Sequence, residues 1–268
     1  MNSIVLSVIL VAGVGLAAGV LLSVAAKVFA VPVDKKAEDI EAFLPGANCG
    51  GCGFSGCAGY AAALSSGETT DTGRCGPGGA DAAKQIASYL GLESGSFEKT
   101  SAVVRCAGTD KVAVHKMEYA GVSSCMMADR LYGGDKSCMY GCIGLGDCVR
   151  ACPYEAIRIC DGIARISPAV CRSCGKCVAA CPKGIIEILP VGSVRAVVLC
   201  KNRDRGNITR KECENGCIGC MKCVKSCEFG AVKVEDFCAS VDASKCTGCG
   251  KCAENCPTGA ISLFNVVG

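Results

Sequence analysis

The sequence has little of several residue types that common protein classes need. Tryptophan is absent, and 7 Phe and 6 Tyr make up an aromatic content of 5%, so a large conventional core is not expected. Histidine occurs once, as His115, which excludes zinc sites with mixed Cys and His ligands and is itself expected to be an exposed or structural residue. The net charge of +3 lacks the strong basic excess of a nucleic-acid-binding protein, which excludes that class.

Cysteine, in contrast, occurs 26 times, which leaves disulfides or metal ligation as explanations. Neighbours in runs such as Cys171-x2-Cys174-x2-Cys177-x3-Cys181 lie too close to pair with each other without strain. Zinc sites made of cysteine alone group as two separated C-x2-C pairs, whereas three evenly spaced cysteines and a fourth are typical of iron–sulfur proteins. Iron–sulfur ligation is therefore the better explanation.

A long uncharged segment lies near the start of the chain, from Ile4 to Ala26. As a helix, its 23 residues would cover the hydrocarbon core of a bilayer. No positive charge precedes it, which argues against a secretory signal, and Lys27, Lys35 and Lys36 follow it. The positive-inside tendency places the C-terminal bulk in the cytoplasm, where thiolates stay reduced. We therefore expect a single-pass anchor in the cell membrane.

The first group of cysteines is Cys49, Cys52, Cys57 and Cys75. Three ligands in one loop and a fourth from a later turn would enclose one [4Fe–4S] cluster, and the surrounding glycines would let backbone N–H groups turn toward the sulfurs. A structural zinc site is the alternative for these four residues. Short helices are expected over 34–44, with Asp34 as N-cap, and over 80–90.

An internal repeat follows, because residues 148–157 (CVRACPYEAI) and 177–186 (CVAACPKGII) are near copies. Bacterial two-cluster ferredoxins carry the run C-x2-C-x2-C-x3-C-P twice, and the fourth cysteine of each run binds the other cluster. The first run here departs from this pattern, reading C-x3-C-x5-C-x3-C, so its loop is longer. The crossing rule predicts two [4Fe–4S] clusters, one bound by Cys171, Cys174, Cys177 and Cys152 and one by Cys138, Cys142, Cys148 and Cys181.

The C-terminal section repeats this arrangement with regular spacing. A short β-prone piece follows each run, which predicts small hairpins beside the clusters, and Glu228 replaces one of the expected prolines. The same crossing rule predicts two more [4Fe–4S] clusters, one bound by Cys217, Cys220, Cys223 and Cys256 and one by Cys246, Cys249, Cys252 and Cys227.

Six cysteines remain outside these five clusters. Cys160 and Cys238 are expected to be ordinary packing residues. The other four could be buried free thiols, but free thiols near iron would risk wrong ligation, so a sixth cluster is the favoured hypothesis. Its ligands would be Cys106, Cys125, Cys200 and Cys213.

The chain as a whole resembles the B subunits of the Rnf complex, in the longer version found in anaerobic bacteria. The resemblance covers essentially the whole chain and rests on the apolar anchor, CGGCGFSGC with its distal Cys75, the insert ending in GGDKSCMYGCIGLGDC, and the ferredoxin-type runs. It implies the electron-transfer subunit of a translocase that couples electron flow between ferredoxin and NAD to sodium or proton movement. Its implied partners are soluble ferredoxin and the other integral and peripheral subunits. The family pattern also includes cysteines matching the four of the sixth cluster.

The residues themselves indicate an electron relay without a complete active site, since no G-x-G-x-x-G fingerprint follows an expected strand. One alternative is a membrane-bound polyferredoxin that stores electrons or reduces a redox sensor. Another is a corrinoid-protein-like module, although the chain lacks room for a cobalamin-binding barrel. The basic segment 201–212 (KNRDRGNITRKE) would suit the docking of an acidic ferredoxin, or it is simply a solvated loop.

The expected fold class is α+β, with a single transmembrane helix followed by small iron–sulfur domains that include two tandem ferredoxin-like units. The expected division is a membrane anchor (1–30), a four-cysteine domain (31–95), an insert that contributes cysteines (96–134), a first two-cluster unit (135–192), a linker with Cys200 and Cys213 (193–216) and a second two-cluster unit (217–268).

Overall fold

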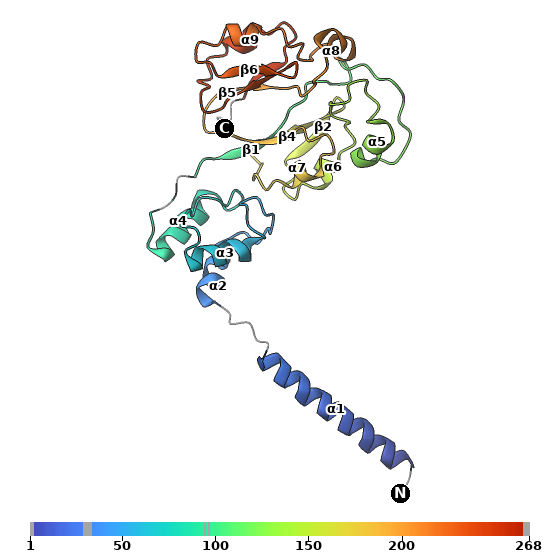
Figure 1. Ribbon diagram of the computed structural model, residues 1–268, viewed down its shortest axis with the longest axis vertical. Coiled ribbons are helices and arrows are strands. Elements are labelled where there is room, and N and C mark those ends of the chain that lie inside the picture. The colour runs from blue at the N-terminus through green and yellow to red at the C-terminus, as the bar shows by residue number, and fades with distance from the viewer. Residues whose placement is uncertain (1–2, 29–33, 94, 96, 265–268) are drawn as a thin grey trace.

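A single helix, a small helical section and two similar β-containing halves follow one another along the chain (Figure 1). The computed structural model describes residues 3–28, 34–93, 95 and 97–264. Helix and strand elements are both present, which confirms the mixed fold class.

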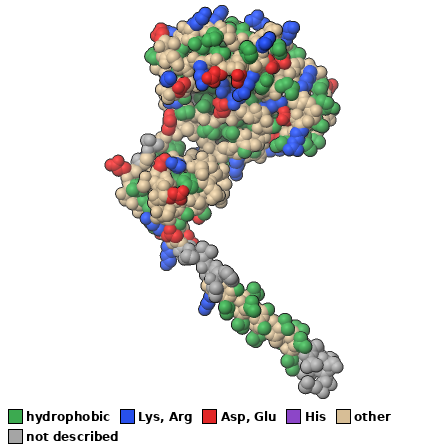
Figure 2. All heavy atoms as spheres, in the orientation of Figure 1, with side chains coloured by type: hydrophobic (Ala, Val, Ile, Leu, Met, Phe, Trp, Pro, Cys, Tyr) green, Lys and Arg blue, Asp and Glu red, His purple; other side chains and the backbone are tan. Residues whose placement is uncertain are grey.

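The first helix, α1 (Ser3–Val28), extends away from the rest of the molecule (Figure 1). Its described apolar side chains are exposed: Val11, Leu16 and Leu21 each keep 71–72% of their surface accessible, and apolar atoms cover much of the helix (Figure 2). Counted over the described residues alone, no helix combines the length and the hydropathy that crossing a membrane requires.

Three helices build the next section: α2 (Lys35–Ala42), α3 (Cys57–Ser66) and α4 (Gly79–Leu90). The helices expected over 34–44 and 80–90 are confirmed to within two residues. Asp34 caps α2, because its Oδ1 accepts a hydrogen bond of 3.0 Å from the N–H of Lys36. The apolar faces of the three helices meet in a small core that includes Ile40, Tyr60, Leu64 and Ile86.

The rest of the described chain, residues 97–264, contains antiparallel two-stranded sheets. The pairs are β1 (Thr100–Val104) with β4 (Ile186–Pro190), β2 (Ile157–Cys160) with β3 (Ile163–Ile166), β5 (Arg195–Val198) with β8 (Ile261–Phe264), and β6 (Val232–Glu235) with β7 (Cys238–Val241). The hairpins expected beside the clusters are confirmed after the first and third runs, as β2–β3 and β6–β7, whereas the strands after the second and fourth runs, β4 and β8, pair with upstream strands instead. Short helices accompany them: α5 (Cys125–Tyr132), α6 (Asp147–Arg150), α7 (Lys176–Ala180), α8 (Gly206–Glu212), α9 (Lys222–Lys225) and α10 (Lys251–Glu254).

Each half borrows a strand from a segment that the sequence placed outside it. β1 falls in the expected insert, yet it pairs with β4 over the whole register from Thr100 opposite Pro190 to Val104 opposite Ile186. β5 falls in the expected linker and pairs in the same way with β8. Residues 100–190 and 195–264 therefore form two halves with the same arrangement of strands. In each half the first strand precedes the cysteine runs and pairs with the last strand.

Arg105, directly after β1, joins the two halves. Its guanidinium makes two hydrogen bonds to the Glu187 carboxylate (3.1 and 3.3 Å), and it also donates to the carbonyl oxygens of Val198 (3.0 Å) and Ala239 (3.5 Å). The side chain is 14% exposed, so these charge-assisted bonds lie largely out of water. One side chain thus holds β4 of the first half against β5 and β7 of the second.

Candidate iron–sulfur sites

The first site lies in the helical section. A cavity beneath the start of α3 is lined by Cys49, Cys52, Cys57 and Cys75. The loop that carries them is fixed by Asn48, whose Oδ1 accepts a hydrogen bond of 2.8 Å from the N–H of Cys57. The N–H of Gly78 donates to the sulfur of Cys75 at 3.3 Å, and burial raises the pKa of that thiol. Four thiols around one space, with a backbone donor to sulfur, suit a [4Fe–4S] cluster.

The first half contains a site that draws on both of its runs. Burial raises the pKa of Cys177 to about 11, and the next contributions come from Cys171, Cys174 and Cys152, so these four thiols are neighbours. Backbone N–H groups of Ala102 and Ser173 each donate to the sulfur of Cys171 at 3.4 Å. Ala102 belongs to β1, which explains why this half needs its upstream strand.

A second cavity in the first half is lined by Cys125, Cys142, Cys148 and Cys181. Burial raises the pKa of Cys148 to about 12, with further contributions from Cys142, Cys125 and Cys181. Cys125 is the first residue of α5, and α5 is held in place because Asp147 accepts hydrogen bonds from the N–H of Met126 (2.9 Å) and the hydroxyl of Ser124 (3.1 Å). The N–H of Ala164 donates to the sulfur of Cys142 at 3.5 Å.

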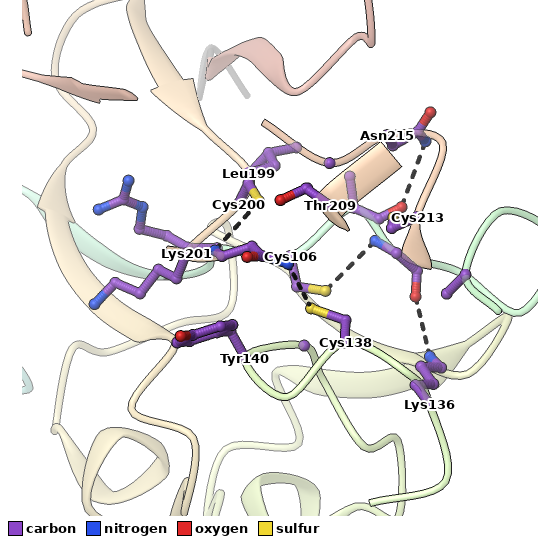
Figure 3. A pocket seen from close by; sticks show the side chains of 17 residues that line it. Cys106, Lys136, Cys138, Tyr140, Leu199, Cys200, Lys201, Thr209, Cys213 and Asn215 are labelled. Carbon is purple, nitrogen blue, oxygen red and sulfur yellow. Dashed lines mark hydrogen bonds between the residues drawn. The ribbon is translucent and has the colours of Figure 1, made fainter. Parts of the chain in front are cut away.

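A third cavity lies between the two halves and is lined by Cys106, Cys138, Cys200 and Cys213 (Figure 3). Burial raises the pKa of Cys138 to about 11, and Cys200 and Cys106 add to the effect. The sulfurs here are well supplied with donors at 3.4 Å: the side-chain amide of Asn202 reaches Cys138, its backbone N–H reaches Cys200, and the N–H of Gly108 reaches Cys106. We name this group the junction site.

The linings of the junction cavity and of the second cavity group two cysteines differently from the expectation. Cys138 was expected beside Cys142, Cys148 and Cys181, and Cys125 in the sixth cluster, whereas Cys138 lines the junction cavity and Cys125 the second cavity. The first run is longer than usual, reading C-x3-C-x5-C, and its first cysteine, Cys138, lines a different cavity from Cys142 and Cys148. Its place beside Cys142 is taken by Cys125, because α5 packs against Ile143.

The second half repeats the arrangement of the first. Burial raises the pKa of Cys223 to about 11, with Cys217, Cys220 and Cys256 contributing, while the pKa of Cys252 is raised by burial with Cys246 and Cys227 nearby. Cys249 belongs to the same run as Cys246 and Cys252, and both Cys220 and Cys249 are exposed. Donors to sulfur occupy matching positions, since the N–H groups of Ala196 in β5 and Ala239 in β7 reach Cys246 (3.5 Å) and Cys217 (3.4 Å).

Of the two cysteines expected to be packing residues, Cys160 is exposed at the end of β2. Cys238 has a more specific position, which sequence reasoning missed. Its thiol donates to the carbonyl oxygen of Cys200 at 3.3 Å. It also lies beside two ligand sulfurs, and its hydrogen bonding lowers the pKa of Cys200 and that of Cys217. Cys238 therefore stands between the junction site and the first site of the second half.

Within the described residues, no three or more His, Cys, Asp or Glu side chains are close enough to hold one metal ion together. A [4Fe–4S] cluster makes a different demand, because four cysteines surround an iron–sulfur core and each binds a separate iron. Buried thiols that surround a space, with N–H groups aimed at the sulfurs, meet that demand.

Matching cysteine sites in two ferredoxin-like halves, preceded by a further four-cysteine section, define a multi-cluster iron–sulfur protein of the electron-transfer class. Comparison with family patterns agrees. Residues 44–77 match the family described as "Putative Fe-S cluster", residues 137–185 match "4Fe-4S dicluster domain", and residues 217–231 and 239–262 each match a "4Fe-4S binding domain" family.

Similar proteins give the particular family. The chain is 43% identical over 247 residues to the B subunit of the ion-translocating oxidoreductase complex of Methanosarcina acetivorans, covering 91% of this chain and 93% of the relative. It is 43% identical to the B subunit of the Na(+)-translocating ferredoxin:NAD(+) oxidoreductase complex of Acetobacterium woodii (91% and 73% covered). It is 40% identical to the proton-translocating counterpart of Clostridium ljungdahlii (91% and 86% covered). The chain therefore belongs to the family of B subunits of the Rnf complex, and the resemblance seen in the sequence is confirmed.

The exchange of Cys125 and Cys138 can be tested by counting iron in double variants. Cys138→Ala and Cys200→Ala should each remove about four irons, and the double variant should lose no more than either single variant, because both residues serve one cluster. Cys125→Ala combined with Cys200→Ala should lose about eight. Iron and acid-labile sulfide analysis of anaerobically purified protein measures this, and the reverse pattern would restore the expected grouping.

Proposed function

We propose that this chain carries electrons through six [4Fe–4S] clusters in a membrane complex that couples electron transfer between ferredoxin and NAD to sodium or proton translocation. The observation that carries the proposal is the run of six four-cysteine groups, of which the junction site connects the two halves. The printed names of the relatives support the coupled reaction, and they name both sodium and proton forms. No dinucleotide fingerprint follows a strand, so NAD chemistry and ion movement belong to partner subunits.

Six sets of ligands follow from the grouping. They are Cys49, Cys52, Cys57 and Cys75; Cys152, Cys171, Cys174 and Cys177; Cys125, Cys142, Cys148 and Cys181; Cys106, Cys138, Cys200 and Cys213; Cys217, Cys220, Cys223 and Cys256; and Cys227, Cys246, Cys249 and Cys252. When bound, each cluster supplies a one-electron redox step. The protein holds the cluster by thiolates, tunes it by hydrogen bonds to sulfur and limits access of water.

Contacts between neighbouring sites favour one linear order. A Cβ placed on Gly51, beside Cys52, would lie 3.5 Å from the carbonyl oxygen of Cys174, so the first section lies close to the first half at this point. The N–H of Cys142 donates to the sulfur of Cys106 at 3.4 Å. On the other side, the thiol of Cys238 donates to the carbonyl oxygen of Cys200 at 3.3 Å, and the N–H of the next residue, Ala239, donates to the sulfur of Cys217 at 3.4 Å. The junction site is thus hydrogen-bonded to a ligand of the first half directly and linked to one of the second half through Cys238 and Ala239, and we infer that electrons pass between the halves through it.

The number of clusters is the most direct test of this proposal. The full chain, purified in detergent without oxygen, should hold about 24 irons and a similar amount of acid-labile sulfide, and the reduced protein should show EPR signals of [4Fe–4S] clusters. About 20 irons would mean that one of the six groups binds no cluster. Bound zinc with little sulfide would contradict electron transfer altogether.

We also infer that α1 anchors the chain in the cell membrane with the iron–sulfur sections on the cytoplasmic side. The uncharged segment Ile4–Ala26 supports this, as do the exposed apolar side chains along α1 and the lysines that follow it.

The anchor can be tested in the chain expressed without partner subunits. Val14→Arg with Leu16→Arg should release the protein from membranes on an alkaline wash, because each charge at the centre of a span costs about 2.5–3.5 kcal/mol. The control pair Val14→Leu with Leu16→Ile keeps the segment apolar and should stay bound. Equal behaviour of the two pairs would rule out an anchor formed by α1.

We further propose that soluble ferredoxin docks over the basic segment that covers the junction site. In this segment Lys201 is already paired with Glu187 at 2.5 Å, so it is not counted. Thr209 and Cys213 line the junction cavity. The exposed cations of the segment are Arg203, whose guanidinium lies 3.8 Å from the Asp236 carboxylate, and Arg205, Arg210 and Lys211. An acidic protein bound there would lie next to a cluster ligand, which short-range electron transfer requires.

Charge reversal tests the docking surface. Arg210→Glu with Lys211→Glu should slow electron uptake from reduced ferredoxin about tenfold at low salt, and the difference should shrink as salt screens the attraction. The matched control is Lys222→Glu with Lys225→Glu, two exposed residues of another short helix, α9. Stopped-flow kinetics at two ionic strengths gives the comparison, and an equal loss in both pairs would argue against a specific surface.

A further inference from the structure

Lys136 is a buried cation that the proposed relay does not yet use. Its side chain is only 4% exposed, and it lines the junction cavity (Figure 3). The ammonium group donates to the carbonyl oxygens of Gly108 (3.0 Å) and Gly162 (2.8 Å). Its carboxylate neighbour, Asp110 at 3.3 Å, has a half-exposed side chain. Burying a lysine costs folding free energy unless its charge is well balanced, and here the balance is only partial. We therefore ask what this charge does in the relay.

The two carbonyl groups that hold Lys136 belong to the loops of two different sites. Gly108 follows Cys106 of the junction site by two residues, and its own N–H donates to the Cys106 sulfur at 3.4 Å. Gly162 precedes β3, in which the N–H of Ala164 donates to the sulfur of Cys142. The ammonium group is therefore fixed between the junction site and the site of Cys142.

The position of Lys136 places its charge close to ligands of both sites. Lys136 lines the cavity with Cys106 and Cys213, and it holds Gly162, which lies two residues before Ala164, the donor to the sulfur of Cys142. The charged groups around Lys136 form a short chain. His115 Nε2 lies 3.4 Å from Asp110, and His115 Nδ1 lies 2.9 Å from Asp135. Among the described residues, Asp110 is the one carboxylate paired with Lys136, and its side chain is half-exposed, so the charge of the buried ammonium group is only partly balanced.

We propose that Lys136 is a positioning residue of the relay: its fixed charge raises the reduction potentials of the junction cluster and of the Cys125, Cys142, Cys148 and Cys181 cluster together. Each cluster becomes more negative when it takes up one electron, and a nearby cation stabilises that reduced form. These two clusters lie in the middle of the proposed order, so the charge of Lys136 makes an electron more stable there than it would be without that charge. This inference rests on the proposed function, since it requires clusters at both sites.

The test compares Lys136→Met with Lys136→Arg in the full chain, purified in detergent without oxygen. Methionine keeps the length of the side chain and removes the charge, whereas arginine keeps the charge. Redox titration followed by EPR should show a lower midpoint potential in Lys136→Met for two clusters, by at least a tenfold change in equilibrium constant, which is about 59 mV for one electron. Lys136→Arg should stay near the wild type. The shifted signals should be those that Cys125→Ala and Cys138→Ala remove.

Iron content separates this inference from the proposed function. Full iron with unchanged midpoints in Lys136→Met would overturn the role of Lys136 and leave the relay intact, as would an equal shift of all clusters. If Lys136→Met loses iron, the variant Asp110→Asn tests the proposal instead. It removes the carboxylate that partly balances the charge of Lys136, at a half-exposed position where the fold should tolerate the change. Its midpoints for the same two clusters should rise, and unchanged values would overturn the proposal.

Discussion

The structure after α1 depends on gathering cysteine thiols in groups of four, most of them buried or partly buried. Burial raises the pKa of Cys138, Cys142 and Cys177 to about 11 and that of Cys148 to about 12, so thiolates there are unfavourable on their own. Metal ligation needs the deprotonated form, and iron supplies the positive charge that makes it stable. Folding and cluster binding are therefore linked, which suits a chain with few aromatic residues and small apolar cores.

Backbone donors to sulfur explain why the two halves share one plan. In the first half, N–H groups from β1 and β3 reach Cys171 and Cys142, and in the second half N–H groups from β5 and β7 reach Cys246 and Cys217. A strand can serve in this way only when it is paired, because pairing fixes which of its N–H groups face the cluster. The upstream strands β1 and β5 are thus parts of the sites as well as of the sheets.

The junction site lies where the two halves of the molecule meet. Its ligands come from four separate segments, and the sulfur of one of them, Cys106, accepts a hydrogen bond from the N–H of Cys142 in the first half. Arg105 holds the halves together beside it, and Cys238 stands between Cys200 and Cys217 on one side. The same contacts that join the two halves therefore also shorten the path between their clusters.

The sequence by itself determined what is local. Spacing within a run located the ferredoxin-type sections, β-prone pieces located two hairpins, and Asp34 as N-cap located the start of α2. The tertiary structure alone decided what joins distant segments: the exchange of Cys125 and Cys138, the use of β1 and β5 as closing strands, and the placement of Lys136 and Cys238 between sites. The reason is physical. Ligand spacing and hairpin turns depend on residues that are neighbours in the sequence. The cavity that an isolated cysteine lines depends instead on how helices and strands pack, and the spacing along the chain does not determine that packing.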